Sequence, residues 1–352
     1  MGLTVLSVAF PFAPVGPDTA GGAEQVLAML DRGLVAAGHR SLVMAAEGST
    51  VAGTLIGMPT AEGEIDEAAR ARIHAAYAAA LARETARRRV DIVHMHGIDF
   101  HAYLPPAGPP VLATLHLPIA WYPPEALRPW RPRTYVHGVS AAQHRDGGRV
   151  WPLPPIENGI DIDAYSGRHA KRGFALMLAR ICPEKGVHLA LDAAREAGVP
   201  LIIAGEVFPY AEHRRYFEEE VAPRLDGLRR YIGPVGGARK RRLLAAARCV
   251  IVASTVPETS SLVAREAMAA GTPVVALARG ALPETIAHGR TGFLVEDTAA
   301  MAAAILRTSE IDPAVCRAEA QRRFSHHQMI ARYFDLYRTL ARAGAPRLGD
   351  AA

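Results

Sequence analysis

Short apolar runs typical of buried strands alternate with segments of helical periodicity along most of the chain. Residues 3–9 and 41–46 are apolar runs, and between them residues 23–38 repeat apolar side chains at the spacing of a helix. Gly38 is suited to end that helix. Strand, Gly-rich loop, helix and strand in this order form a βαβ unit. The pattern therefore predicts an α/β fold with doubly wound parallel sheets.

The alternation continues through the first half, stops at a Pro-rich loop and then starts again. In the first half it predicts one long helix at 64–89 and further strands at 91–97, 110–118 and 135–140. The loop 152–161 contains Asn-Gly and marks the domain boundary. Beyond it, helices are predicted at 187–198, 209–225 and 238–248, and strands at 174–179, 200–206, 228–235, 249–255, 272–277 and 291–295. The segment 325–344 has the pattern of an amphipathic helix.

Composition narrows the class of protein. The 352 residues suffice for two domains, and 50% hydrophobic with 21% charged residues predict a packed globular protein. The net charge of +5 suits an anionic ligand but is too small to indicate nucleic acid, for which no binding motif occurs. Three cysteines without a C-x-x-C argue against a disulfide framework or a zinc site and fit a reducing cytosol.

The amino terminus is apolar but has no basic leader, and no stretch is long and apolar enough for a transmembrane helix. We therefore expect a cytoplasmic protein. Arginine clusters at 87–89 and 239–242 leave contact with an anionic membrane surface open, but solvated helix faces are favoured, because neither helix has a strong apolar side.

Two glutamates stand where a strand passes into a helix. Glu258 follows the predicted strand 249–255, and Glu266 lies about two turns along the next helix, which Ser260 or Ser261 can cap. Ligands of open α/β sheets bind outside the carboxyl ends of the strands. Since carboxylate oxygens accept from hydroxyls, the pair suits a sugar or a ribose. The alternative is a solvated helix face, which the flanking apolar strands disfavour.

Cations and histidines also follow predicted strands. Arg180 and Lys185 share one loop, where they can hold two phosphates or simply be solvated. His94 and His96 lie two apart on one face of a strand; a buried polar contact is favoured over a metal pair, because no third ligand stands nearby. His116 ends the strand 110–118.

The glutamate segment, which continues into AMAAGTPVVA, resembles the E-x7-E motif of retaining glycosyltransferases of family 4, which have the GT-B fold. The string ARICPEKG at 179–186 resembles the diphosphate loop of that family, with Ala179 at a usual glycine. GGAE at 21–24, TLH at 114–116 and NGID at 158–161 are also similar to family segments.

The resemblance implies two Rossmann-like domains facing a central cleft. Residues 1–158 would bind the acceptor, residues 159–327 would bind the nucleotide-sugar, and a helix at 328–345 would cross back to the first domain.

The resemblance also implies roles for individual residues. Glu266 would bind the ribose, while Glu258 and His116 would be the catalytic residues at the transferred sugar. The implied donor-binding set also contains Gly22, Arg180, Lys185, Gly205, Val235, Ser260, Ser261 and Leu262; His94 and His96 are candidates on the acceptor side. The chain departs from the family at 259–261, where Thr-Ser-Ser replaces the usual Gly-Phe-Gly.

These roles imply a retaining transfer from a UDP- or GDP-sugar to a hydroxyl-bearing acceptor. The family mechanism is same-face substitution, in which the departing phosphate takes the acceptor proton. Neither a metal nor another cofactor is expected, because the loop cations can balance the charge of the leaving group. Two alternatives stay open: another enzyme of this fold, such as a sugar-nucleotide epimerase, and a protein that binds a sugar or nucleotide without chemistry.

Overall fold

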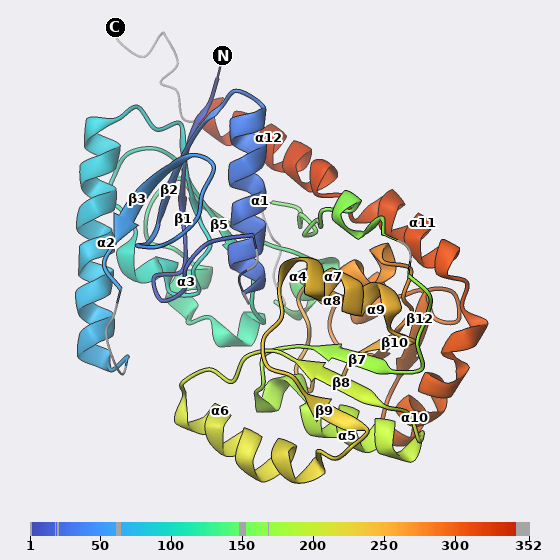
Figure 1. Cartoon of the computed structure of the whole chain (residues 1–352). Coiled ribbons are helices and arrows are strands. Elements are labelled where there is room, and N and C mark those ends of the chain that lie inside the picture. Colours follow the sequence, from blue (N-terminus) through green and yellow to red (C-terminus); the bar gives the residue numbers. More distant parts are fainter. Residues whose placement is uncertain are drawn as a thin grey trace, which may run out of the picture. The chain divides into compact units, whose positions relative to one another are not determined.

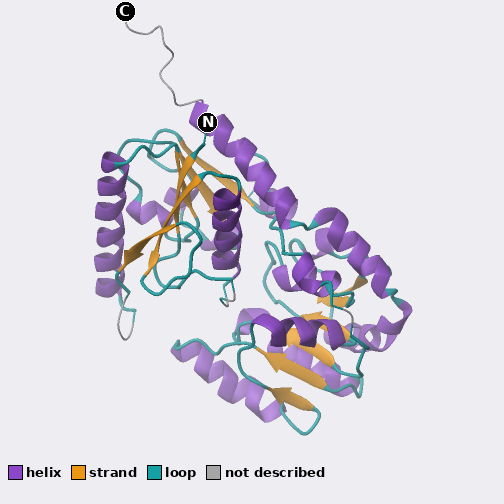
Figure 2. Ribbon diagram, turned by 45° about the horizontal axis from the view of Figure 1, so that its top comes forward, coloured by secondary structure: helices purple, strands orange, loops and turns teal. Residues whose placement is uncertain are grey.

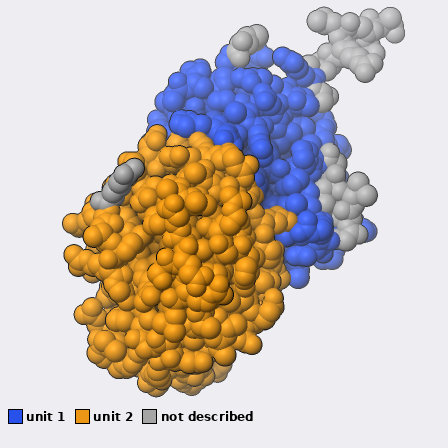
Figure 3. Space-filling model, turned by 90° about the vertical axis from the view of Figure 1, so that its right-hand side faces the viewer, with its two compact units in different colours: residues 1–157, 327–352 blue, residues 158–326 orange. Residues whose placement is uncertain are grey.

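The computed structural model describes residues 2–17, 19, 21–60, 65–147, 153–167 and 169–342. The chain forms two compact units: unit 1 contains residues 1–157 and 327–352, and unit 2 contains residues 158–326 (Figure 3). Three predicted ends, Glu64 of the long helix, Pro152 of the boundary loop and the last helix beyond Arg342, lie outside the described residues.

Unit 1 is built on a parallel sheet of six strands in the order β3-β2-β1-β4-β5-β6 (Figure 1). The strands are β1 (Thr4–Val8), β2 (Arg40–Ala46), β3 (Thr54–Met58), β4 (Ile92–Met95), β5 (Val111–Leu115) and β6 (Thr134–Gly138). The helices are α1 (Gly22–Ala36), α2 (Glu67–Arg87), α3 (Pro124–Leu127), α4 (Ala141–Asp146) and, from residue 327 on, α12 (His326–Arg342), with 3-10 turns η1 (Phe100–Tyr103) and η2 (Ile119–Trp121).

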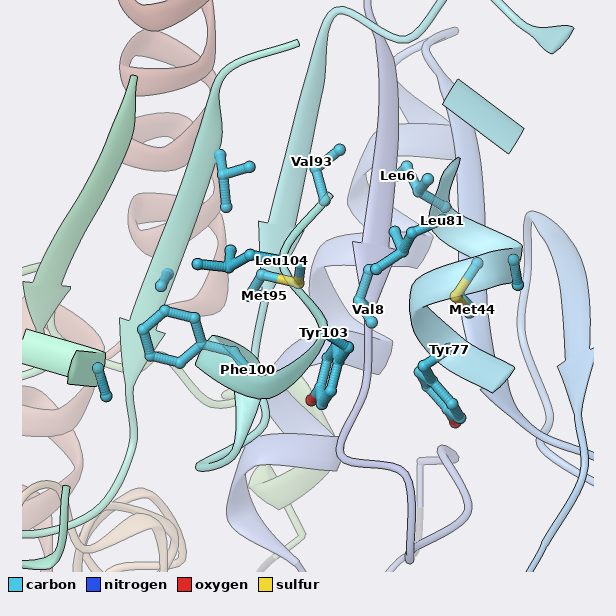
Figure 4. Close-up of a cluster of buried hydrophobic side chains, with 14 of the residues drawn as sticks. Leu6, Val8, Met44, Tyr77, Leu81, Val93, Met95, Phe100, Tyr103 and Leu104 are labelled. Atoms are coloured by element: carbon cyan, nitrogen blue, oxygen red, sulfur yellow. The ribbon is translucent and has the colours of Figure 1, made fainter. Parts of the chain in front are cut away.

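The core of unit 1 shows why these runs form strands. Leu6 and Val8, two residues apart, point to the same face of β1 and pack with Tyr77 and Leu81 of α2 (Figure 4). Val5 on the opposite face is equally buried. Helices flank both faces of the sheet (Figure 2), so the strands read as continuous apolar runs.

The amphipathic pattern of α12 is confirmed by its packing. Its buried residues are Met329, Ile330, Tyr333, Phe334, Tyr337 and Leu340. The Ile330 side chain packs against Gly33 of α1, where a Cβ would lie 2.8 Å from its Cδ1. The last helix therefore belongs to the first unit, as the sequence predicted.

Unit 2 repeats the architecture, with six parallel strands in the order β12-β11-β10-β7-β8-β9. The strands are β7 (Ala175–Leu178), β8 (Leu201–Ala204), β9 (Arg229–Tyr231), β10 (Cys249–Val252), β11 (Val274–Leu277) and β12 (Gly292–Val295). The helices are α5 (Val187–Glu196), α6 (Ala211–Tyr216), α7 (Gly237–Ala246), α8 (Leu262–Ala269), α9 (Leu282–Thr285), α10 (Thr298–Arg307) and α11 (Pro313–Arg323). Shorter turns are η3 (Asp163–Tyr165), η4 (Pro183–Lys185), η5 (Phe217–Val221), η6 (Ala222–Arg224) and η7 (Thr308–Glu310).

In both sheets the order of the strands reverses at one point. The reversal falls between β1 and β4 in unit 1 and between β7 and β10 in unit 2. Open α/β sheets bind ligands outside the carboxyl ends of the strands at this switch point. In unit 2 the two loops there carry Arg180, Lys185 and Glu258.

Candidate active site

The loop that follows β7 packs against the segment that follows β10. Gly186 has φ 62°, in the left-handed region that favours glycine, and a Cβ there would lie 2.1 Å from the carbonyl oxygen of Ala253. The Thr255 N–H donates to the Glu184 carbonyl oxygen at 2.9 Å. These contacts hold the two segments together, so that a charged side chain on one segment can contact a side chain on the other.

Glu258 is a partly buried carboxylate that several segments contact. The Lys185 ammonium donates to Oε1 at 2.5 Å, and the Ser254 hydroxyl donates to the same oxygen. The Ala281 N–H donates to the Glu258 carbonyl oxygen at 2.7 Å, and a Cβ at Gly280 would lie 2.3 Å from that oxygen. Burial raises the pKa of Glu258, but the charge and hydrogen bond of Lys185, the Ser254 hydrogen bond and the charge of Arg180 together lower the pKa overall. Glu258 is therefore an anion at neutral pH.

Glu266 lies about one turn into α8, because the helix begins only at Leu262. The expected position about two turns along the helix was wrong. Of the two serines proposed as caps, Ser261 caps the helix by accepting from the Ala264 N–H at 3.3 Å.

The two oxygens of the Glu266 side chain, which is buried, have different surroundings. Lys240 Nζ donates to Oε1 at 2.7 Å. Burial, together with the charge of the nearby Glu266 carboxylate, raises the pKa of the Tyr165 phenol. Oε2 is buried and has no hydrogen-bond partner among the described residues. A buried polar atom without a partner costs about 1–3 kcal/mol, so Oε2 marks a position where a ligand donor would fit.

Arg180 joins the same cluster. Its guanidinium carbon lies 5.7 Å from the centre of the Phe208 ring, within the range of a cation–π contact. Its charge contributes to the lowered pKa of Glu258. Arg180, Lys185 and Glu258 thus bring two cations and one anion together at the switch point, an arrangement that can bind phosphates.

Two further donor-side candidates flank this cluster in unit 2. Gly205 directly follows β8. A Cβ there would lie 1.7 Å from the carbonyl oxygen of Ala179, so only glycine allows the loop after β7 to approach this closely. The Tyr231 hydroxyl donates to the Gly205 carbonyl oxygen at 2.9 Å. Val235 is partly buried in the segment between β9 and α7.

The remaining donor-side candidates lie at helix starts. Ser260 precedes the cap of α8, and its hydroxyl oxygen is buried without a hydrogen-bond partner among the described residues. Leu262 is the buried first residue of α8. Gly22 is the exposed first residue of α1 in unit 1, where Gly21, with its Cβ position 1.7 Å from Glu24 Oε2, is the more constrained glycine.

In unit 1 a buried hydrogen-bonded network crosses the sheet. His94 Nδ1 lies 2.7 Å from the Tyr337 hydroxyl, and His94 Nε2 lies 2.7 Å from the Thr114 hydroxyl. Thr114 also contacts His137 Nε2 at 2.7 Å and the Tyr333 hydroxyl at 3.2 Å. Both nitrogens of His94 therefore bond to side chains of unit 1, which is the buried polar contact that the sequence favoured.

His96 and His116 extend the network to the carboxyl edge of the sheet. His96 Nδ1 lies 3.0 Å from His116 Nε2, while the buried His96 Nε2 has no hydrogen-bond partner in the described part of the chain. Burial lowers the pKa of His116 to about 4 and that of His137 to about 3, and it lowers the pKa of His96 well below its usual value, so all three rings are neutral at pH 7. One of the paired rings must therefore donate and the other accept.

Several of these residues were not predicted. Lys240, Tyr165 and Gly280 lie beside the two glutamates but come from other segments, Ser254 bonds to Glu258 from four residues earlier in the chain, and His137 joins the histidine network from β6. Polar residues within apolar strands were an available signal for His137, which pairs in register with Thr114. For Lys240, Tyr165 and Gly280, only the fold brings the residues to the site.

One group of side chains in the described ranges has the arrangement of metal ligands: Cys182, Glu184 and His213 of unit 2. Also within those ranges, no helix has both the length and the apolar character that crossing a membrane requires.

Known proteins match both units. Residues 20–164 match the model described as Glycosyltransferase Family 4, and residues 173–310 match Glycosyl transferases group 1. A phosphatidyl-myo-inositol mannosyltransferase of Mycobacterium leprae is 28% identical over 294 residues, covering 72% of this chain and 75% of that protein.

Solved structures agree with the family matches. A glycosyltransferase involved in avilamycin A biosynthesis is 27% identical with a TM-score of 0.73, covering 97% of this chain and 99% of that one. The Anabaena protein HepE, solved in complex with UDP and glucose, is similar in fold at 19% identity, with a TM-score of 0.71 and coverage of 96% and 100%.

Two doubly wound units with these matches define a glycosyltransferase of the GT-B fold. More specifically, the chain belongs to the family 4 glycosyltransferases, and its second unit matches glycosyl transferases group 1.

Proposed function

We propose that the protein transfers a sugar from a UDP- or GDP-sugar to a hydroxyl acceptor with retention of the anomeric configuration. The observation that carries the proposal is the Glu266 carboxylate: Lys240 holds Oε1, while Oε2 is buried without a partner among the described residues. A ribose hydroxyl would supply the missing donor. Glu258, which lies between β10 and α8, would then face the transferred sugar.

The cations of the loop after β7 would bind the diphosphate. Negative charge grows on this leaving group in the transition state, and cations already in place lower that barrier. The Lys185 ammonium has three N–H donors, so it can keep its bond to Glu258 and add one to a phosphate oxygen. With Arg180 beside it, the loop would need no metal.

Same-face substitution assigns the remaining roles. The departing phosphate would take the proton of the incoming hydroxyl, so no enzyme nucleophile is required. His116 would act as a neutral hydrogen-bonding group toward the donor sugar, because burial lowers its pKa to about 4. On the acceptor side, His96 keeps a buried nitrogen for a ligand, whereas His94 does not.

A cytoplasmic setting is part of the proposal. Its support is that Cys182, Cys249 and Cys316 are all buried and free, as expected in a reducing compartment.

Release of free nucleoside diphosphate from UDP- and GDP-sugars, with and without hydroxyl acceptors, tests the proposal. We expect release that depends on the acceptor and continues in EDTA, and a Glu258→Gln variant that is slower by about 100-fold. Conversion of the donor without release would indicate an epimerase. Binding without conversion would indicate a protein without chemistry. Loss of activity in EDTA that manganese restores would refute metal independence.

A further inference from the structure

On the proposed diphosphate loop and on α6, three side chains of unit 2 converge that have no assigned role in sugar transfer. Cys182 and Glu184 lie on the loop after β7, and His213 comes from α6. The Cys182 Sγ, a Glu184 carboxylate oxygen and a ring nitrogen of His213 all lie within 4.8 Å of one another. The fold thus joins two neighbouring residues to one that is distant in sequence.

Two of these groups have polar atoms that are buried without a partner. His213 is 8% exposed, and its Nδ1 has no hydrogen-bond partner among the described residues; Glu184 Oε2 is in the same situation. Leaving such atoms unpaired costs about 1–3 kcal/mol each. Phe208, stacked at 6.2 Å, and Tyr210, edge-on at 5.2 Å, pack around the His213 ring. The unpaired atoms are therefore held in place by packing.

A thiolate, a carboxylate and an imidazole are ligands that Zn²⁺ accepts, and the sulfur disfavours Mg²⁺ and Ca²⁺. Zinc–ligand bonds of about 2.0–2.3 Å require the three atoms to close to about 3.5 Å, which small side-chain rotations can provide. We propose that Cys182, Glu184 and His213 bind Zn²⁺, and that the ion ties the loop 179–186 to α6. Three protein ligands would leave a fourth position for water or an anion.

The three proposed ligands are not among the residues proposed for sugar transfer, although two of them share the loop of Arg180 and Lys185. Burial raises the pKa of the Cys182 thiol to about 11, so binding would release its proton and raise the local charge by one. The sequence alone disfavoured a zinc site, because the three cysteines are widely spaced and form no C-x-x-C. α6 supplies the third ligand only in the folded unit.

Metal binding to the full-length chain tests the inference. Protein freed of metal with a chelator is titrated with Co²⁺, followed by the thiolate-to-cobalt absorption band, and with Zn²⁺ by calorimetry. We expect one site per chain, and binding weakened by more than about tenfold in Cys182→Ser and His213→Gln. Cys249→Ser and Cys316→Ser, which remove the other buried cysteines, should bind like the wild type.

Circular dichroism checks that each variant folds. If Cys182→Ser or His213→Gln does not fold, Glu184→Gln, at a partly exposed position, replaces it. The inference is overturned if the wild type binds no Zn²⁺ at micromolar concentration. It is equally overturned if the ligand variants bind as tightly as the wild type. Both readouts are independent of sugar transfer.

Discussion

At the scale of single residues, the two glutamates are held by different neighbours. Lys185 and Ser254 bond to Glu258 at the strand end, while Lys240 bonds to Glu266 in α8. The first lysine belongs to the proposed diphosphate loop and the second does not. The two carboxylates should therefore be separable by mutation.

Glu266→Gln should weaken binding of the free nucleoside diphosphate about tenfold or more, because a charge-assisted bond to the ribose is worth about 1.5–3 kcal/mol. Glu258→Gln should leave this binding unchanged or tighter, since it frees Lys185 and the ligand has no sugar; transfer should fall instead. Calorimetry measures the binding of the nucleoside diphosphate, and steady-state rates measure the transfer. If both variants bind like the wild type, Glu266 is not at the ribose. If only Glu258→Gln abolishes binding, the roles are reversed.

The neutral histidines of unit 1 predict a pH dependence of stability. Burial lowers the pKa of His116 from its ordinary value of 6.5 to about 4 in the folded state, so the unfolded chain binds more protons between these values. The stabilisation is complete above pH 6.5 and is lost as the pH falls toward 4. At about 1.4 kcal/mol per pKa unit, His116 alone contributes on the order of 3 kcal/mol.

Denaturant unfolding at pH 7.5 and pH 5 measures this effect. His116→Asn should reduce the difference between the two free energies of unfolding, whereas His169→Asn, at an exposed histidine, should leave it unchanged. An undiminished difference in His116→Asn would show that His116 does not titrate as its burial implies.

At the scale of elements, α12 is fixed to unit 1 by close packing and by hydrogen bonds. Ile330 fills the space above Gly33, and Tyr333 and Tyr337 reach Thr114 and His94 in the sheet. The amphipathic pattern predicted this helix and its apolar face, but the polar partners of its tyrosines depend on the register of β4 against β5.

Gly33→Val should destabilise unit 1 by about 1–3 kcal/mol, because the new side chain meets Ile330. Ile330→Ala alone should cost about 2–5 kcal/mol through the space it leaves. The double variant should lose less than the sum, since each change relieves the other. Chemical denaturation of the four proteins measures the coupling, and strict additivity would show that the two residues do not pack together.

At the scale of the whole molecule, most of the architecture could be predicted, because buried parallel strands are apolar runs. The exceptions have physical reasons. β3 is a short edge strand that is only partly buried, and the Ala-rich α10 shows little contrast between its faces. Asp31, which is buried and accepts from the Ala52 and Gly53 N–H groups, anchors the turn into β3, but no sequence pattern marks it.

The candidate site was predictable where its residues share one segment. Arg180 with Lys185, and Glu258 with Glu266, follow strands that the fold places side by side. Lys240, Tyr165 and Gly280 lie on other segments, and their contacts exist only after folding. His213, the third ligand of the proposed zinc site, was not predicted for the same reason, because it lies on another segment than Cys182 and Glu184.

The central claim is retaining transfer from a nucleotide-sugar, and the anomeric configuration of the product tests it most directly. Proton NMR of the first product formed, from a donor of known configuration and with the slow Glu258→Gln variant as the control, distinguishes retention from inversion. The account predicts the configuration of the donor in the product, with one nucleoside diphosphate released per sugar transferred. A product of inverted configuration would contradict it.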